Sequence, residues 1–205
     1  TILDQEVNIQ NPDAVLKALL TNLDITTDIT LTKGVLDVLD HSSPFPNFGN
    51  KIGVDLTTRF TGEPPRSAPP VTEPPPTQSG LQCIIQTSVP GAVDGRHLFP
   101  ELSERPDARN RVIAVSVEKA KGRGGKDFAA MLFALPELTM FNIFVLFDPG
   151  VDLTDASYML WKLYNNTDPG RDIIMEGDRC VIDACKKGPM DGHEREWPDE
   201  LTFDV

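Results

Sequence analysis

The chain has 205 residues, 40% of them hydrophobic, which is enough for one sizeable core or two small ones, because domains typically run to ~100 to 150 residues. With 31 acidic and 19 basic residues the net charge is -12, and a field of that sign repels phosphate backbones and anionic lipid surfaces. The longest dense apolar run, residues 141–147, is far shorter than the ~20 residues of a membrane-spanning helix. We therefore expect neither a nucleic-acid partner nor a transmembrane segment.

The chain begins abruptly with "TILD", which is typical of the end of a strand running into a turn. We expect from this that the sequence starts inside a longer protein. A helix, a turn and a strand follow up to Ile29, and "GNKIGVDLTTR" at residues 49–59 predicts another strand. These elements form the first unit, residues 1–62.

A proline-rich segment at residues 63–79, "EPPRSAPPVTEPPPTQS", has seven prolines in seventeen residues and no apolar periodicity. Proline fixes φ and removes an amide donor, so the segment favours polyproline II or disorder over a helix or an inner strand. We interpret it as a linker between the first unit and a second unit at residues 80–205.

The second unit alternates predicted strands and helices. Residues 111–119 and 141–148 are apolar strands of the kind buried in parallel sheets, with a helix at 126–138 between them. A second helix over 153–166, with Thr154 as its candidate N-cap, ends at "DPG", and two short strands follow in "RDIIMEG" and "RCVIDA". This order predicts the α/β class, with two related β-α-β units, a mostly parallel sheet and the proline-rich linker between them.

Part of the chain is repeated. Residues 4–29 align without a gap to residues 148–173 at an offset of 144 positions, and eight positions over residues 1–29 are identical. Further on, "GNKIGVDLTTR" corresponds to "GDRCVIDACKK" at residues 177–187, now at an offset of 128. We interpret this as an internal duplication in which the second copy lacks a loop of sixteen residues.

The segment "LDVLDHSSPFPNFGNKIGVDLTTRFTGE" resembles the carboxy-terminal region of UbiD-type decarboxylases, the 3-polyprenyl-4-hydroxybenzoate carboxy-lyase-like family. The resemblance lies in a Leu-Asp pair, a Ser-Pro loop and a Gly-x-Lys-x-Gly-x-Asp strand, here Leu39, Asp40, Ser43, Pro44, Gly49, Lys51, Gly53 and Asp55. The second unit is similar to other parts of the same pattern, in "VSVEK", "FVLFDPGVDLTDASYMLWKLYNNTDPGRD" and "REWP". On this basis the first unit is the family's ordinary carboxy-terminal segment and the second is an added copy.

The resemblance implies a carboxy-lyase that uses prenylated FMN and a divalent metal on aromatic or unsaturated acids, usually in quinone biosynthesis. It places the catalytic Arg and Glu-x4-Glu element in an earlier part of the protein, and "EREWPDE" and "ELSE" do not reproduce that spacing. We therefore expect no catalytic, cofactor-binding or metal-binding residue in this chain. The expected partners are the amino-terminal catalytic domain of the same protein and further copies in a homo-oligomer.

The strongest candidate for a ligand site is "EKAKGRGGKDF", where a strand enters a basic, Gly-rich turn and a helix, since backbone N-H groups and a helix dipole there could hold a phosphate. By position, Lys119 or Lys121 matches a family lysine that approaches the flavin phosphate. The alternative is a solvated basic turn in which Asp127 itself occupies the positive end of the helix. The sequence leaves the choice open.

Other reactive residues favour structural roles. His41, His97 and His193 lie far apart in sequence, and Cys180 and Cys185 are predicted on opposite strand faces, which disfavours a shared metal. The three cysteines, which include Cys83, form no even disulfide framework, so we expect a reducing, cytoplasmic setting.

The two tryptophans each have two interpretations. Trp161 suits core packing or a partner interface, and Trp197 suits a seam, with another subunit as one possible neighbour.

The leading hypothesis is a noncatalytic assembly part of a decarboxylase. The second is a free-standing module whose acidic surface recruits a basic partner. A third, a self-sufficient flavin or nucleotide enzyme, needs a complete site that the sequence does not display.

Overall fold

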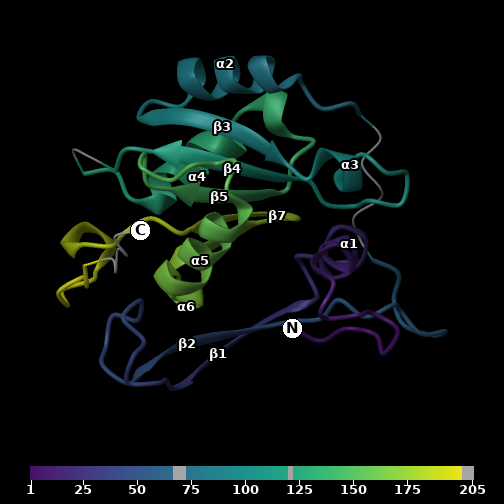
Figure 1. The fold of residues 1–205 in the computed structure, drawn as a ribbon, viewed down its shortest axis with the longest axis horizontal. Helices are drawn as coiled ribbons and strands as arrows, with labels where there is room; N and C mark the ends of the chain where they lie inside the picture. The colour runs from purple at the N-terminus through teal and green to yellow at the C-terminus, as the bar shows by residue number, and fades with distance from the viewer. Residues whose placement is uncertain (67–72, 120–121, 200–205) are drawn as a thin grey trace, which may run out of the picture.

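The computed structural model describes residues 1–66, 73–119 and 122–199, and its strands in those ranges form two sheets (Figure 1). A two-stranded ribbon consists of β1 (Ile29–Val35) and β2 (Phe48–Val54). The five-stranded main sheet has the order β3-β4-β5-β7-β6, with the bounds Ala92–Leu98, Val112–Val117, Ile143–Phe147, Arg179–Asp183 and Ile173–Glu176 in that order. The helices are α1 (Pro12–Asn22), α2 (Gln78–Ser88), α3 (Pro100–Ser103), α4 (Gly125–Phe133), α5 (Ala156–Asn166) and α6 (Pro169–Asp172), with short 3-10 turns at Pro136–Leu138 and Pro189–Asp191.

The pairing confirms the α/β class and shows a mixed sheet. The pairs β4–β5 and β5–β7 are parallel, as expected for strands joined through helices. The outer pairs β3–β4 and β6–β7 are antiparallel, so the sheet is less parallel than the sequence predicted. The reason at one edge is local, because β6 and β7 are joined by a tight turn at Gly177, whose φ of 60° suits glycine, and a hairpin must be antiparallel.

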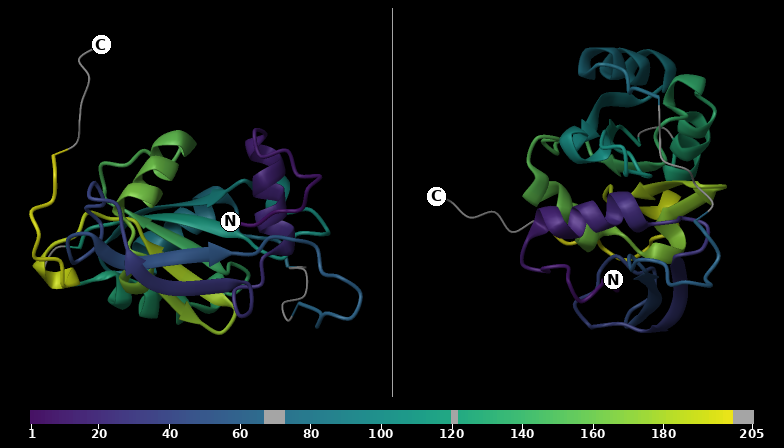
Figure 2. Two further views of the ribbon diagram at one scale, coloured as in Figure 1. Left: turned by 90° about the horizontal axis from the view of Figure 1, so that it is seen from below. Right: turned by 90° about the vertical axis from the view of Figure 1, so that its right-hand side faces the viewer.

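Helices cover both faces of the main sheet. One apolar cluster joins α2 and α4 to one face, and a second joins α1 and α5 to the other. The views agree that the ribbon lies beyond α1 and α5, farthest from α2 (Figures 1 and 2). In the described part of the chain no helix is long and apolar enough to cross a membrane.

The central strands and their helices follow from local sequence. Every residue of β4 and β5 is buried, as their continuous apolar character predicts. Helix α4 ends at Phe133, earlier than the predicted 138, because Pro136 restricts the residue before it and a 3-10 turn follows.

The predicted N-cap of α5 was wrong. Asp155 caps the helix by accepting a hydrogen bond from Tyr158 N at 2.9 Å. The Thr154 hydroxyl instead donates to Asp152 Oδ1 at 2.7 Å, because the turn before the helix brings these two side chains together. A helix therefore forms where the sequence predicted one, beginning one residue later than Thr154 would have set it.

The proline-rich segment ends earlier than expected. Residues 67–72 lie outside the described residues, and residues 73–77 carry no helix or strand. Gln78 and Ser79 belong to α2, because Thr77 accepts a hydrogen bond from Gly80 N and α2 itself contains no proline. The apolar cluster under the main sheet draws residues from both sides of the segment, including Leu20 and Leu56 from the first unit and Val112 and Val145 from the second.

The repeated segments have matching elements. Helices α1 and α5 begin and end 144 positions apart, at 12 and 156 and at 22 and 166. Ile2 forms a parallel bridge with Asp55, and Leu146 pairs in parallel with Asp183 at the corresponding positions. The first unit therefore contains the end of a strand, a helix and two further strands, as the second unit does after β5.

Several hydrogen bonds also recur at the two offsets. Asn22 Nδ2 donates to Leu56 O at 2.9 Å, and Asn166 Nδ2 donates to Ala184 O at 2.9 Å. Asp24 N donates to the Asp28 carboxylate at 2.9 Å, and Asp168 N donates to the Asp172 carboxylate at 2.8 Å. The internal duplication stays a prediction, and these paired contacts support it.

Candidate functional site

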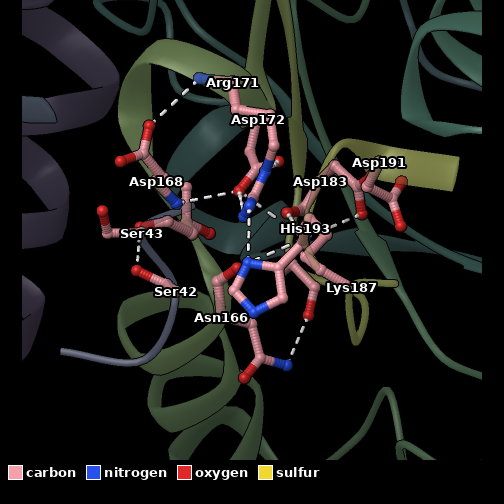
Figure 3. A network of polar contacts seen from close by, with 12 residues as sticks. Ser42, Ser43, Asn166, Asp168, Arg171, Asp172, Asp183, Lys187, Asp191 and His193 are labelled. Carbon is pink, nitrogen blue, oxygen red and sulfur yellow. Dashed lines mark hydrogen bonds and ion pairs between the residues drawn. The ribbon is translucent and has the colours of Figure 1, made fainter. Parts of the chain in front are cut away.

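A buried polar network lies where β4 and β7 end beside α4 and α6 (Figure 3). We use this name for eight residues that come from the end of β4, the end of β7, helix α6 and the segment after β7: Lys119, Asp168, Arg171, Asp172, Asp183, Lys187, Asp191 and His193. The carboxyl end of parallel strands is where α/β proteins usually place their ligand sites. The network is therefore the candidate site.

Asp183 is the centre of the network. Its carboxylate forms an ion pair with Lys119 Nζ at 2.7 Å and lies 3.4 Å from Lys187 Nζ. Burial acts to raise the pKa of Asp183, but the two ammonium groups outweigh burial and the pKa is lowered. A Cβ on Gly125 would lie 2.4 Å from Asp183 Oδ2, so the start of α4 needs glycine to approach this carboxylate.

Lys187 is a buried cation held by backbone and carboxylates together. Its side chain is 0% exposed, and its ammonium group donates to the carbonyl oxygens of Asn166 at 3.2 Å, Asp183 at 2.7 Å and Cys185 at 2.6 Å. The Asp172 carboxylate lies 3.6 Å away. A buried ammonium is tolerated only when its donors are satisfied in this way.

Asp172 and Arg171 form a two-pronged ion pair. Arg171 Nε donates to Asp172 Oδ1 at 2.7 Å, and Arg171 Nη2 donates to Oδ2 at 2.7 Å. Burial raises the pKa of Asp172 even though Arg171 and Lys187 act to lower it. The sequence predicted both residues at the start of the strand "RDIIMEG", but they end the short helix α6, and the strand begins after them at Ile173.

Asp168 connects the network to the ribbon. It is the N-cap of α6 and accepts hydrogen bonds from Gly170 N at 3.1 Å and Arg171 N at 3.2 Å. It also accepts from Asn50 of β2, through the backbone N at 3.1 Å and Nδ2 at 2.6 Å. A Cβ on Gly170 would lie 2.3 Å from Asn50, so this contact too depends on a glycine.

The last described residues form a strap across the two units. Arg195 Nη1 donates to Asp40 O at 3.1 Å and Ser43 O at 3.0 Å, and the Trp197 ring packs edge-on against His41 and His193. We call residues 193–197 the strap. The spacing of His41 and His193 in the sequence did not indicate that the two residues lie near each other. The related feature noted in the sequence was Trp197 of the "REWP" segment. The prediction that Trp197 covers a seam is confirmed.

The pKa values of the two histidines are both lowered. For His193, burial is the largest cause and the cations Arg171 and Arg195 add to it. For His41, burial outweighs the opposing effect of Asp40. His193 Nε2 is buried with no hydrogen-bond partner among the described residues, and Nδ1 lies 3.2 Å from Arg171 Nη1.

The Gly-rich turn does not present a vacant phosphate cradle. Gly124 N donates to Asp127 Oδ2 at 2.9 Å, so Asp127 occupies the helix start, as one of the two alternatives held. Lys119 is tied to Asp183 and to Asp191 Oδ1, each at 2.7 Å, and Lys121 lies outside the described residues. A cavity of about 420 Å³ beside the turn is lined by four aspartates and two cations, Asp127, Asp172, Asp183, Asp191, Lys126 and Arg171. Arg171 is paired with Asp172 and the carboxylates outnumber the cations, so the described residues disfavour a phosphate.

The cysteines and the remaining aromatic residue are also placed. Cys180 and Cys185 belong to the apolar clusters on opposite faces of the main sheet, which confirms the predicted facing. Burial raises the pKa of the Cys180 thiol to about 12. Among the residues that the structure describes, no group of three or more His, Cys, Asp or Glu could hold a metal ion. Trp161 is 46% exposed and stacks on Tyr158, so the core-packing interpretation was wrong.

One family model matches most of this chain. The family described as "3-octaprenyl-4-hydroxybenzoate carboxy-lyase C-terminal domain" matches residues 1–56 and 82–190. Uncharacterized proteins of two Helicobacter pylori strains, 26695 and J99, are each 31% identical over 198 residues, covering 95% of this chain and 29% of their own length. An uncharacterized protein of Aquifex aeolicus is 37% identical over 105 residues, 43% of this chain and 22% of its own. The chain therefore spans less than a third of these relatives.

Two solved structures are similar over part of the chain. The UbiD-class enzyme HmfF from Pelotomaculum thermopropionicum, in an evolved dimeric form with prFMN, has a TM-score of 0.46 and 19% identity, over 60% of this chain and 26% of its own. Vanillic acid decarboxylase from Sedimentibacter hydroxybenzoicus, in open form, has a TM-score of 0.47 and 17% identity, over 61% of this chain and 28% of its own. The family match spans most of the chain on both sides of the proline-rich segment. This chain belongs to the family of 3-octaprenyl-4-hydroxybenzoate carboxy-lyase C-terminal domains.

Proposed function

We propose that this chain is the carboxy-terminal, noncatalytic assembly part of a larger decarboxylase. That enzyme would use prenylated FMN and a divalent metal to remove carboxyl groups from aromatic acids, in the cytoplasm and in quinone biosynthesis. The family match supports the decarboxylase setting. The observation that carries the noncatalytic role is that the cations of the polar network are held by the chain's own carboxylates and carbonyl groups.

The protonation states in the network suit structure better than chemistry. Burial acts to lower the pKa of Lys119, but Asp183 outweighs it and the pKa is raised, so the ammonium stays protonated at neutral pH. Outside the network, the Cys180 thiol of the apolar cluster, with a pKa of about 12, also stays protonated and is no nucleophile. A general acid or base works best with a pKa near the operating pH, and neither group meets that condition.

An assembly role has a surface to act through. The end of β1 and the loop that joins it to β2, residues 36–47, expose apolar side chains. Val35, Val38, Leu39 and Phe45 are exposed by 73%, 74%, 84% and 64%. Exposed apolar residues that lie together mark protein–protein interfaces more often than free surface. We infer that this loop contacts the amino-terminal catalytic domain or another copy in a homo-oligomer.

Co-expression tests the assembly role. The remainder of the natural protein, expressed separately, is expected to co-purify with the 205-residue chain, and the double variant Leu39→Asp, Phe45→Asp is expected to abolish co-purification. Val93→Asp is the matched control, because Val93 is exposed on β3 in the second unit, outside this loop. Equal loss with the control variant would show that the loop is not the contact.

Cofactor binding tests the noncatalytic role. The purified 205-residue chain, mixed with prenylated FMN and Mn²⁺, is expected to elute from gel filtration without flavin absorbance. Stoichiometric flavin in the protein peak would overturn the proposal. The remainder of the natural protein, treated in the same way, is expected to retain the flavin.

A free-standing acidic interaction module is the second candidate, and the net charge of -12 favours it. Such a module would bind a basic partner through exposed charges, so binding would weaken steeply with salt. Contact through the apolar loop predicts binding that is nearly independent of salt between 50 and 500 mM NaCl. The same co-purification, repeated across that range, separates the two.

A further inference from the structure

A cavity of about 250 Å³ lies between the ribbon and the main sheet. Helices α1 and α5 form two of its walls through Leu16 and Leu19 on one side and Leu160 and Leu163 on the other. These are two of the identical pairs of the sequence repeat, at an offset of 144 positions. The two units therefore meet through corresponding faces and leave the cavity between them.

The main sheet and the ribbon form the other two walls of the cavity. Its floor on the main sheet is formed partly by Val112, Val145 and Cys180, and Ile29 and Val54 of the ribbon lie across from the sheet. The ribbon is held at its distance by polar contacts outside the cavity, in particular by Asn50 and Asp168. These contacts tie β2 to the start of α6 beside the cavity.

The chemistry of the walls selects an uncharged apolar occupant. The residues that line the cavity carry no charged side chain, and apart from the sulfur atoms of Cys180 and Met159 and the Tyr164 hydroxyl their side chains are hydrocarbon. A buried water needs two to four polar partners, which these walls do not supply. An empty cavity forfeits the dispersion contacts of its lining atoms. Cavities of about 150 Å³ with such walls stay dry and bind benzene or xenon, and this one is larger.

The cavity also has a way in. Leu160 and Tyr164 line it and are 51% and 74% exposed, so its rim at α5 faces solvent. We propose that the cavity is a binding site for a small, uncharged apolar molecule of the size of a single-ring alkylbenzene. This site is separate from the polar network and does not depend on the proposed assembly role.

Toluene is the probe for the first test. Titration of the 205-residue chain, labelled with ¹³C at its methyl groups, is expected to shift the methyl signals of Leu163 and Ile29 saturably and to give nuclear Overhauser contacts between them and toluene. The methyl signals of Leu132, which is buried in the cluster on the other face of the main sheet, are expected to stay in place. Shifts that do not saturate, or that appear equally at Leu132, would overturn the proposal.

A filled cavity provides the second test. Cys180→Leu replaces the sulfur atom by three carbon atoms in a side chain that lines the cavity, and it is expected to weaken toluene binding at least tenfold. Cys83→Leu is the matched control, because Cys83 is exposed on α2, and it is expected to leave the affinity within twofold. Equal affinities in the two variants would refute the site. If Cys180→Leu fails to fold, the Overhauser contacts in the unaltered chain decide the question.

The longer natural protein provides the third test, because another of its segments could fill the cavity. The site we propose predicts that toluene gives the same contacts to Leu163 and Ile29 in the longer protein. Loss of those contacts, with new contacts from protein protons to the same methyl groups, would show that a polypeptide segment is the occupant and would overturn the proposal.

Discussion

The polar network of the second unit has a counterpart in the first unit. In both, an aspartate at corresponding positions, Asp28 and Asp172, pairs with two cations, but the cations differ. In the first unit Asp28 pairs with Arg59 and, at 3.5 Å, with Arg66. In the second unit Asp172 pairs with Arg171 and lies 3.6 Å from Lys187, which stands 128 positions after Arg59. Arg59 is 26% exposed, whereas Lys187 is 0% exposed. The carboxylate therefore lies at the corresponding position in both units. The burial of its cation decides how much stability is lost when that cation is removed.

The two units also differ in what surrounds the aspartate at the end of the last strand, which is Asp183 in the second unit and Asp55 in the first. Lys119 after β4 and Gly125 of α4 cover Asp183 in the second unit. The corresponding residue of the first unit, Asp55, accepts hydrogen bonds from Thr57, through N at 2.9 Å and Oγ1 at 2.7 Å, and these bonds lower its pKa. Hydrogen bonds from a neighbouring threonine therefore stabilise the Asp55 carboxylate, whereas ion pairs stabilise the Asp183 carboxylate.

The largest expected effect comes from the buried ammonium. Lys187→Met leaves Asp172 and Asp183 buried with fewer cations, and breaking a buried pair in this way costs about 3–5 kcal/mol. Arg59→Met is expected to cost only about 1 kcal/mol, because that pair is partly exposed and Arg66 remains. Urea unfolding followed by circular dichroism measures both free energies of unfolding. Equal losses would contradict the comparison.

The next effect concerns the glycine under Asp183. Gly125→Ala places a methyl group 2.4 Å from the Asp183 carboxylate and is expected to destabilise the fold by about 1–3 kcal/mol. Gly53→Ala in the ribbon, where the nearest atoms lie at 3.9 Å, is expected to change stability by less than about 0.5 kcal/mol. The same unfolding measurement compares the two. A neutral Gly125→Ala variant would mean that Asp183 can move away without loss.

A smaller effect is expected from the strap. Trp197→Ala removes the ring between His41 and His193 and is expected to cost about 1–2 kcal/mol. The same variant is expected to speed amide hydrogen exchange in the loop at residues 36–47, because Arg195 next to it binds that loop. Trp161→Ala, at a half-exposed ring, is the control and is expected to leave exchange in that loop unchanged. Faster exchange in both variants would show a general loosening instead.

The smallest effect is a dependence on pH. Burial lowers the pKa of His193 and of His41 below 6.5 in the folded chain. As pH falls, these histidines therefore bind protons more readily in the unfolded chain than in the folded chain. Stability is therefore present in full above pH 6.5 and declines below it, by at most roughly 1.4 kcal/mol per pH unit for each histidine.

Unfolding at pH 8.0 and pH 5.5 measures this decline. The variant His193→Gln is expected to reduce the loss of stability between the two pH values. His97→Gln, away from the strap, is compared with it and is also expected to reduce the loss, because burial lowers the pKa of His97 as well. An unchanged decline in His193→Gln would assign it to other groups.

The sequence predicted the elements whose signals are local. The strands at 112–117 and 143–147 followed from continuous apolar runs, and the opposite facing of Cys180 and Cys185 followed from strand geometry. Asp127 as the group at the start of α4 was one of two alternatives, and the structure selects it. Each of these depends on neighbours within a few residues along the chain.

The polar network and the cavity could not be predicted in the same way. Lys119 reaches Asp191 across a separation of 72 residues, and Asn50 reaches Asp168 across 118, so each contact depends on the order of strands in the sheet. The antiparallel pairing of β6 with β7 follows from a tight turn at Gly177, which apolar periodicity does not encode. The same holds for His41 and His193, which both pack against Trp197.

The shared core gives the proline-rich segment the role of a tether rather than a boundary. Leu20 and Leu56 before it pack in the same cluster as Val112 and Val145 after it. A covalent connection of this kind raises the local concentration of one piece around the other. Cutting the chain between residues 63 and 79 would leave two complementary fragments. They would stay together by the apolar contacts they already share, and would separate only on dilution below their dissociation constant.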